Sequence, residues 1–308
     1  MAKRVGVAFG GGGARGLAHI GVIRALRNHP STLPCVVAGT SAGSIAAVLY
    51  AAGLPQARLE EIARHFGWFH DVIRLSDTVR GVIGRGQRGG VVSNAALGHT
   101  VNELIGGRSF ADLPVDVAVV ATDLEGRRRV IFCSESVAGR LRRRELERYL
   151  APPSEGLPGC ETVVVSDVAD VGLAVRASCA VPGFFLPVEV AGMRLVDGGV
   201  VDQVPVDVVR AMGASFTIGV SLAMGYTAEK ITRPVAAISS MVALLGVLVV
   251  RRSLDLADVG YQISGIETRS LVDTHQLDLI DRGESDTEEH LAGRLWRGPK
   301  GPRSRRRI

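Results

Sequence analysis

Several residue types are scarce in this 308-residue sequence. It has only 4 cysteines and no Cys-x-x-Cys pair. Cys35, Cys133 and Cys179 lie among apolar residues, so we expect reduced core thiols rather than disulfides or metal ligands. No histidines and acidic residues have the spacing of a metal site, so neither a metal nor a cofactor is expected. Aromatic residues make up 5% of the chain, which leaves Ala, Val, Leu and Gly to build the core.

A hydrophobic run long enough to span a membrane is also absent. The longest apolar stretch, residues 235–250, has 16 residues including two serines, which is short for a span. The first four residues lead straight into an apolar strand pattern, so no signal peptide is expected and we predict a cytoplasmic protein. A hydrophobic content of 46% in a chain of this length is compatible with one large domain.

The net charge of +5 is unevenly distributed, because residues 294–308 hold seven basic residues and no acidic one. We therefore predict a domain over residues 1–293 and a basic, disordered tail over 294–308. This tail is either simply solvated or weakly attracted to an anionic membrane surface. Nucleic acid is not an expected partner, since no aromatic motif accompanies the basic residues. Residues 66–90 form either a lid that meets lipid through Phe66, Trp68 and Phe69, or an ordinary crossover.

Strand and helix patterns alternate along the chain, which is typical of a largely parallel sheet covered by helices on both faces. Strands are predicted at 4–9, 34–38, 115–121, 129–133, 162–165, 186–190 and 216–221, and helices at 17–27, 43–52, 56–66, 93–105, 205–212 and 235–257. Residues 136–160, with a charged helix at 140–148, are interpreted as a solvated insertion. Ligands of such sheets bind outside the carboxyl ends of the strands.

One of these carboxyl ends carries the pattern Gly-x-Ser-x-Gly, at Gly39, Ser41 and Gly43. An apolar strand precedes it and an Ala-rich helix follows it, so the serine is predicted on a sharp turn with its hydroxyl projecting from the fold. Glycines two residues to either side remove the Cβ atoms that would clash in so tight a bend. A strand-to-helix joint with an incidental serine is the alternative interpretation.

A second glycine cluster, residues 10–16, follows the first strand and precedes a helix. Its unpaired backbone N–H groups can bind an anion, either a dinucleotide pyrophosphate or an oxyanion beside Ser41. The dinucleotide interpretation requires an acidic residue about 20 positions later. None occurs between Met1 and Leu59, which favours the oxyanion interpretation.

A third motif places Asp197 at the end of a short strand, directly before Gly198 and Gly199. Alone, it reads as an ordinary surface turn, where Asp-Gly is common. With the other two motifs it completes a nucleophile, an oxyanion site and a base at the ends of strands. Asp202, five residues later, is expected to support the Asp197 turn.

These motifs, in this order, resemble the bacterial patatin-like phospholipase and esterase family. The Gly-rich loop (Gly11, Gly12, Gly13, Arg15, Gly16), the nucleophile turn (Gly39, Ser41, Gly43) and the Asp-Gly-Gly turn (Asp197, Gly198, Gly199) match, as do residues 15–22, 119–124 and 177–183. The resemblance covers about residues 4–290. It implies a three-layer α/β/α fold with a largely parallel sheet and a metal-independent Ser–Asp dyad.

The resemblance further implies a serine acyl hydrolase, a phospholipase, lysophospholipase or carboxylesterase acting on a lipid or ester substrate. Ser41 would be the nucleophile, Asp197 its base, and Gly11, Gly12 and Gly13 the oxyanion hole. Arg15 would either hold an anionic head group or pin the loop through an ion pair. Two alternatives stay open: an esterase with a Ser-Asp-His triad that uses His19, His275 or His290, and a non-catalytic lipid-binding module on the same fold.

Overall fold

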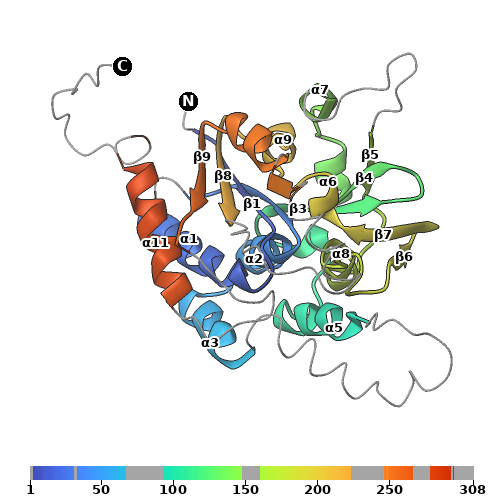
Figure 1. Cartoon of the computed structure of the whole chain (residues 1–308), viewed down its shortest axis with the longest axis horizontal. Helices are drawn as coiled ribbons and strands as arrows, with labels where there is room; N and C mark the ends of the chain where they lie inside the picture. Colours follow the sequence, from blue (N-terminus) through green and yellow to red (C-terminus); the bar gives the residue numbers. More distant parts are fainter. Residues whose placement is uncertain are drawn as a thin grey trace.

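A nine-stranded sheet forms the centre of the computed structural model (Figure 1). The structure describes residues 3–30, 33–66, 93–147, 160–222, 244, 246–247, 249–265, 278–292 and 294. Seven strands follow the order β5-β4-β3-β2-β1-β8-β9, and β6 and β7 branch from β3. The strands are β1 (Val5–Phe9), β2 (Val36–Thr40), β3 (Asp116–Asp123), β4 (Arg128–Phe132), β5 (Glu161–Val165), β6 (Val188–Val190), β7 (Met193–Asp197), β8 (Phe216–Leu222) and β9 (Val259–Ile263).

The sheet is mostly parallel, as predicted. β1 pairs in parallel with β2 and β8, β2 with β3, β8 with β9, and β4 with β5. β4 and β7 both pair antiparallel with β3, and β6 pairs antiparallel with β7. The connection from β3 to β4 is short, and a short connection joins antiparallel neighbours. The prediction did not include β9.

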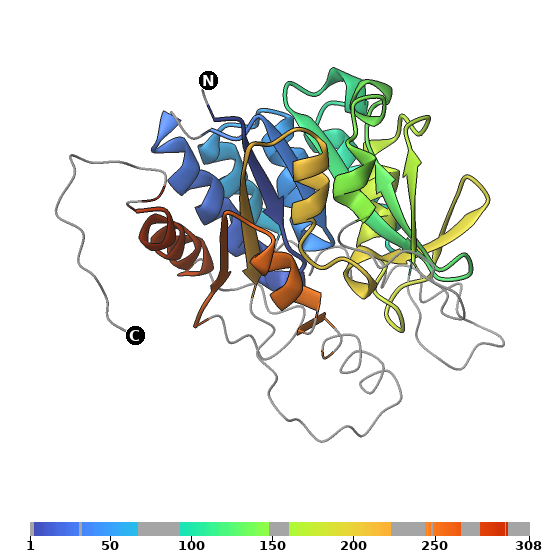
Figure 2. The same ribbon diagram turned by 90° about the horizontal axis from the view of Figure 1, so that it is seen from above.

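Helices cover both faces of the sheet, which confirms the three-layer α/β/α class (Figure 2). The helices are α1 (Ala18–Arg27), α2 (Ala42–Ala51), α3 (Gln56–Phe66), α5 (Ala95–Leu104), α6 (Glu135–Ala138), α7 (Arg143–Glu147), α8 (Val171–Ser178), α9 (Val206–Ala211) and α11 (Asp278–Leu291), with 3-10 turns η1 (Gly13–Leu17), η4 (Phe110–Asp112) and η5 (Gly198–Val200). Side chains of β1 alternate between two cores. Val5, Val7 and Phe9 pack with α1, α2 and α8, whereas Ala8 packs with α9.

Four of these helices differ from the sequence prediction. α7 is not a solvated decoration, because its Leu146 is 5% exposed and the preceding Arg142 N–H donates to Ala211 O on α9 at 3.0 Å. α6, α8 and α11 were not predicted. Residues 67–92 and 295–308, which contain the proposed lid and nearly all of the basic tail, lie outside the described residues. Within the described part, no helix combines the length and apolar composition needed to cross a membrane.

α11 packs directly on α1, the helix that follows the Gly-rich loop. A Cβ on Gly21 would collide with the Ile280 backbone, and one on Gly283 with the Ala18 backbone, so both glycines permit this close approach. Beside them, Arg24 bonds Glu284 and Asp281 of α11, each at 2.6 Å, and Glu60 of α3 at 3.1 Å.

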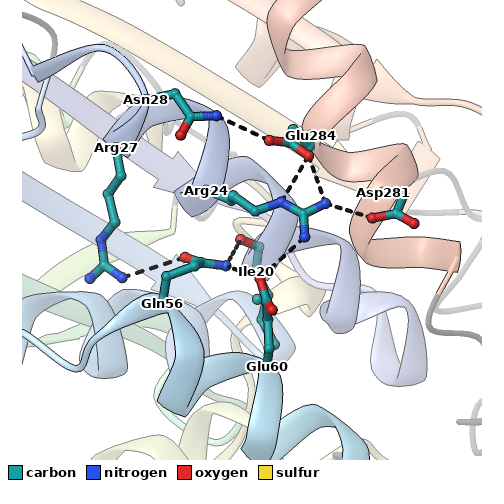
Figure 3. A network of polar contacts seen from close by, with 8 residues as sticks. All are labelled: Ile20, Arg24, Arg27, Asn28, Gln56, Glu60, Asp281 and Glu284. Carbon is teal, nitrogen blue, oxygen red and sulfur yellow. Dashed lines mark hydrogen bonds and ion pairs between the residues drawn. The ribbon is translucent and has the colours of Figure 1, made fainter.

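Figure 3 shows this polar network joining three helices distant in sequence. Asn28 and Gln56 extend it, with bonds to Glu284 and Glu60. Gln56 also accepts a hydrogen bond from the Arg27 guanidinium and donates one to the Ile20 carbonyl oxygen.

Candidate active site

The nucleophile candidate lies at the joint between β2 and α2. Ser41 has φ 53° and ψ −127°, a conformation strained for a non-glycine residue. A Cβ on Gly39 would meet Gly43 O, and one on Gly43 would meet Phe9 O, so the turn closes only with glycine at both positions. Ser41 is only 5% exposed, so its side chain lies inside the site rather than projecting into solvent as predicted.

A second serine fixes this turn. The Ser178 hydroxyl accepts the Ser41 N–H at 2.9 Å and donates to Val120 O on β3 at 2.6 Å. The Ser41 N–H is therefore engaged and cannot serve a substrate. Ser178 lies outside the three motifs, and its position in the family-like stretch 177–183 was the available sequence signal for a role.

The Gly-rich loop lies against the nucleophile, since a Cβ on Gly11 would be 3.2 Å from Ser41 Cβ. Gly10 N–H donates to Val220 O at 2.9 Å, and Gly11 N–H donates to Gln203 O at 3.1 Å. Among the described residues, none accepts the N–H of Gly12 or of Gly13, whose φ is 58°. Of the three predicted oxyanion donors, Gly11 is thus already occupied, and Gly12 and Gly13 are available.

Asp197 is the last residue of β7, which pairs with β3. β3 also pairs with β2, the strand that leads to Ser41. A Cβ on Gly198 would collide with Val120 O and lie 3.1 Å from Thr40 Cγ2, so the Asp197 turn packs on the strand that precedes Ser41. Asp197 Oδ1 accepts the Gly199 N–H at 2.8 Å. Oδ2 is buried and has no hydrogen-bond partner among the described residues.

Burial dominates the electrostatics of this carboxyl group. It raises the pKa of Asp197 to about 6, against the lowering effects of the Ser41 hydroxyl and the Gly199 N–H. The Ser41 hydroxyl is thus close enough to influence Asp197, although its geometry falls short of a hydrogen bond to Oδ2. Catalytic hydrogen bonds are often long before substrate binds. A carboxylate with this pKa can accept a proton near neutral pH.

Asp202 supports the turn, as the sequence suggested. Its N–H donates to Gly198 O at 2.9 Å, and its carbonyl oxygen accepts the Thr40 hydroxyl at 2.8 Å. Its side chain is buried beside Arg129 and Asp207, with the Arg129 Nη1 atom 2.7 and 2.8 Å from the two carboxylates. Burial and the neighbouring Asp207 raise the pKa of Asp202 above its ordinary value, despite Arg129.

The histidines that a triad would require make other contacts. His19 Nε2 donates to Gly10 O at 2.7 Å, and burial lowers the pKa of His19 to about 4, so the ring is neutral. His290 stacks on Tyr261 with its Nδ1 atom 2.7 Å from Asp286 O. His275 lies outside the described residues. No hydrogen bond joins His19 or His290 to Ser41 or Asp197.

The remaining sequence-based expectations concern Arg15, the cysteines and metal ligands. Arg15 is 6% exposed in η1, and burial lowers its pKa. All four cysteines are free, with Cys133 and Cys179 buried, which agrees with the expected reduced thiols. No cluster of three or more potential metal ligands occurs among the described residues.

In comparisons with known proteins, this chain matches one family model and several curated relatives. The family model described as patatin-like phospholipase matches residues 7–210. An uncharacterized NTE family protein of Mycobacterium tuberculosis is 31% identical over 224 residues, which is 71% of this chain and 49% of that protein. The lysophospholipase NTE1 of Candida glabrata is 28% identical over 225 residues, which is 71% of this chain and 10% of that protein.

Solved structures match at lower similarity. VipD from Legionella pneumophila aligns with 95% of this chain and 67% of its own, at 14% sequence identity and a TM-score of 0.47. The chain spans about half, or less, of the length of the curated relatives it matches. The family match ends within α9, so β8, β9 and α11 lie beyond it.

Proposed function

This chain belongs to the patatin-like phospholipase family, and from this premise we propose that it is a serine acyl hydrolase that cleaves lipid acyl esters with a Ser41–Asp197 dyad. The observation that carries the proposal is the strained Ser41 turn packed beside a buried carboxyl group with a raised pKa. Such perturbed groups cluster at functional sites. The name of the Candida glabrata relative supports a lipid ester as substrate.

The proposed reaction proceeds in two steps. Asp197 takes the proton from Ser41 Oγ as Oγ bonds to the ester carbonyl carbon. The Gly12 and Gly13 N–H groups stabilise the oxyanion, and the ester C–O bond then breaks as the alcohol leaves with the proton. Water attacks the acyl-serine with Asp197 again as base, which releases the carboxylic acid and restores Ser41.

Arg15 has a supporting role in this proposal. Its 6% exposure favours holding the Gly-rich loop over binding a head group directly. Among the remaining motif glycines, Gly39 and Gly43 let the nucleophile turn close against the end of β1, and Gly198 lets the Asp197 turn pack on β3 and Thr40.

Substitution of the dyad tests the proposal with p-nitrophenyl esters and a fluorophosphonate label. Ser41→Ala should abolish both hydrolysis and labelling, whereas Ser136→Ala, an exposed serine on α6, should change neither. Hydrolysis that persists in Ser41→Ala at the wild-type rate would contradict the assignment. An intact protein that neither hydrolyses esters nor takes the label would support the lipid-binding alternative.

Histidine variants test the triad alternative. His275→Ala, His290→Ala and His19→Gln, which keeps an N–H donor for Gly10 O, should each leave most of the activity, whereas Asp197→Asn should lower it by orders of magnitude. A histidine variant as inactive as Asp197→Asn would favour the triad.

Where the protein acts is a further part of the proposal. We place it in the cytoplasm, with peripheral attraction of the basic residues 294–308 to anionic membranes. Deleting these residues should weaken sedimentation with anionic vesicles at low salt and leave hydrolysis of a small ester unchanged. The difference should fade as salt screens the charges. Equal vesicle binding by both forms at low salt would reduce the tail to a solvated segment.

A further inference from the structure

Gln203 is a polar side chain at the site to which neither sequence motif nor mechanism has assigned a task. It is 8% exposed, and its backbone oxygen accepts the Gly11 N–H at 3.1 Å. Within the described residues, no hydrogen bond joins its carboxamide to another protein group. The carboxamide is therefore free to form a hydrogen bond with a substrate that enters the site.

The Gln203 carboxamide lies between the Gly-rich loop beside Ser41 and the Asp197 turn. The point where a Cβ of Gly11 would lie is 2.9 Å from Gln203 Nε2 and 3.2 Å from Ser41 Cβ. The corresponding point at Gly199 is 3.3 Å from Gln203 Cδ, 3.0 Å from Asp197 Oδ1 and in contact with Gln203 Oε1. The amide nitrogen therefore faces the Gly-rich loop near Ser41, and the amide oxygen faces the Asp197 turn.

The donors available to an oxyanion are few at this site. Gly10, Gly11 and Ser41 have their N–H groups committed to Val220 O, Gln203 O and Ser178 Oγ. Side-chain amides supply oxyanion donors in other acyl-transfer enzymes, where the decisive feature is a pre-oriented N–H in a water-poor site. Gln203 Nε2 lies against Gly11, in the same loop as Gly12 and Gly13, and the residue is 8% exposed.

We propose that the Gln203 Nε2–H donates to the substrate's carbonyl oxygen and, more strongly, to the oxyanion that forms when Ser41 attacks. Gln203 is thus a third oxyanion donor beside Gly12 and Gly13. This inference rests on the proposed function, because it requires ester hydrolysis at Ser41. The unpaired carboxamide is then a group held ready for substrate.

Two variants of matched shape test the donor. Gln203→Met keeps the length of the side chain without a donor, and Gln203→Glu keeps the shape but places a carboxylate near the oxyanion. We expect kcat on a p-nitrophenyl ester to fall about 10²-fold in Gln203→Met, with little change in KM, and at least as far in Gln203→Glu. Fluorophosphonate labelling should slow in parallel. Gln262→Met, at an exposed position on β9, should match wild type.

Three results would overturn the inference. The first is a kcat within about threefold of wild type in Gln203→Met. The second is a lowered kcat in Gln203→Met together with a wild-type kcat in Gln203→Glu, because the shape of the side chain alone would then matter. The third is a loss accompanied by an upward shift of the acidic limb of the pH profile, which would mean that the amide donates to Asp197 instead. Thermal unfolding of each variant shows whether it is folded, and the isosteric Gln203→Glu keeps the test open if Gln203→Met is not.

The experiments test the proposed function and the role of Gln203 separately. If Ser41→Ala retains hydrolysis, the proposed function is wrong. If Ser41→Ala is inactive and Gln203→Met is fully active, the serine hydrolase stands and only the donor role of Gln203 is wrong.

Discussion

Replacing Asp197 by asparagine should inactivate the protein and also stabilise it at pH values above 6. Asparagine keeps the shape of the side chain but cannot take the Ser41 proton. It also removes a carboxylate that the folded protein must hold almost without water, at 5% exposure. Ionising a group in such surroundings costs free energy, which is why the pKa of Asp197 is raised to about 6.

The size and pH dependence of the effect follow from this pKa. A rise from 3.8 to about 6 corresponds to about 3 kcal/mol lost from the free energy of unfolding once Asp197 is ionised. Well below pH 3.8 the group is protonated in both folded and unfolded protein, so the cost vanishes. As pH rises through 6 the cost becomes complete. The advantage of Asp197→Asn should therefore grow from about 0.5 kcal/mol at pH 4 to about 3 kcal/mol at pH 8, the latter equal to about 5 °C in Tm.

Thermal unfolding of the wild type and two variants between pH 4 and 8 measures this effect. Ser41→Ala is the matched control, because it is also inactive but keeps the buried carboxylate. It loses the hydroxyl that lowers the Asp197 pKa, so it should gain no stability at pH 8 and should lose a little. A stability difference between Asp197→Asn and wild type that does not change with pH would refute the description of Asp197 as a buried, ionisable base.

Three further predictions concern the base, the nucleophile turn and the C-terminal helix. Log kcat/KM should fall with unit slope below about pH 6 and level off above it, because only ionised Asp197 accepts a proton; a flat profile from pH 5 to 8 would contradict this. Ser178→Ala should lower kcat about 10-fold or more while the protein stays folded, since the nucleophile turn loses its bond to β3; unchanged kcat would show that the turn holds without it. Gly283→Leu should lower the free energy of urea unfolding by about 2–3 kcal/mol because α11 no longer fits against α1, whereas Gly139→Ala, whose nearest contact is 3.5 Å away, should be nearly neutral.

Local features of the site could be read from contiguous residues. Glycines at positions 39 and 43 indicated a closed turn because only a residue without Cβ permits such an approach, and the structure has that turn at Ser41. Most strands and the helices α1, α2, α3, α5 and α9 were predicted for a similar reason, since apolar periodicity reflects which face is buried. β9, α6, α8 and α11 were missed. β9 alternates buried and exposed residues and so lacks a continuous apolar run, and α11 is rich in charged residues.

The sequence by itself determined the backbone shape of each motif and the alternation of strands and helices, because those depend on neighbours along the chain. Only the tertiary structure decided how the motifs act on one another. The Ser178 bond to Ser41 joins residues 137 positions apart, and the engagement of Gly11 by Gln203 depends on two loops packing together. The pKa of Asp197 is likewise a property of the surrounding core, because burial sets it and burial is decided by the whole fold.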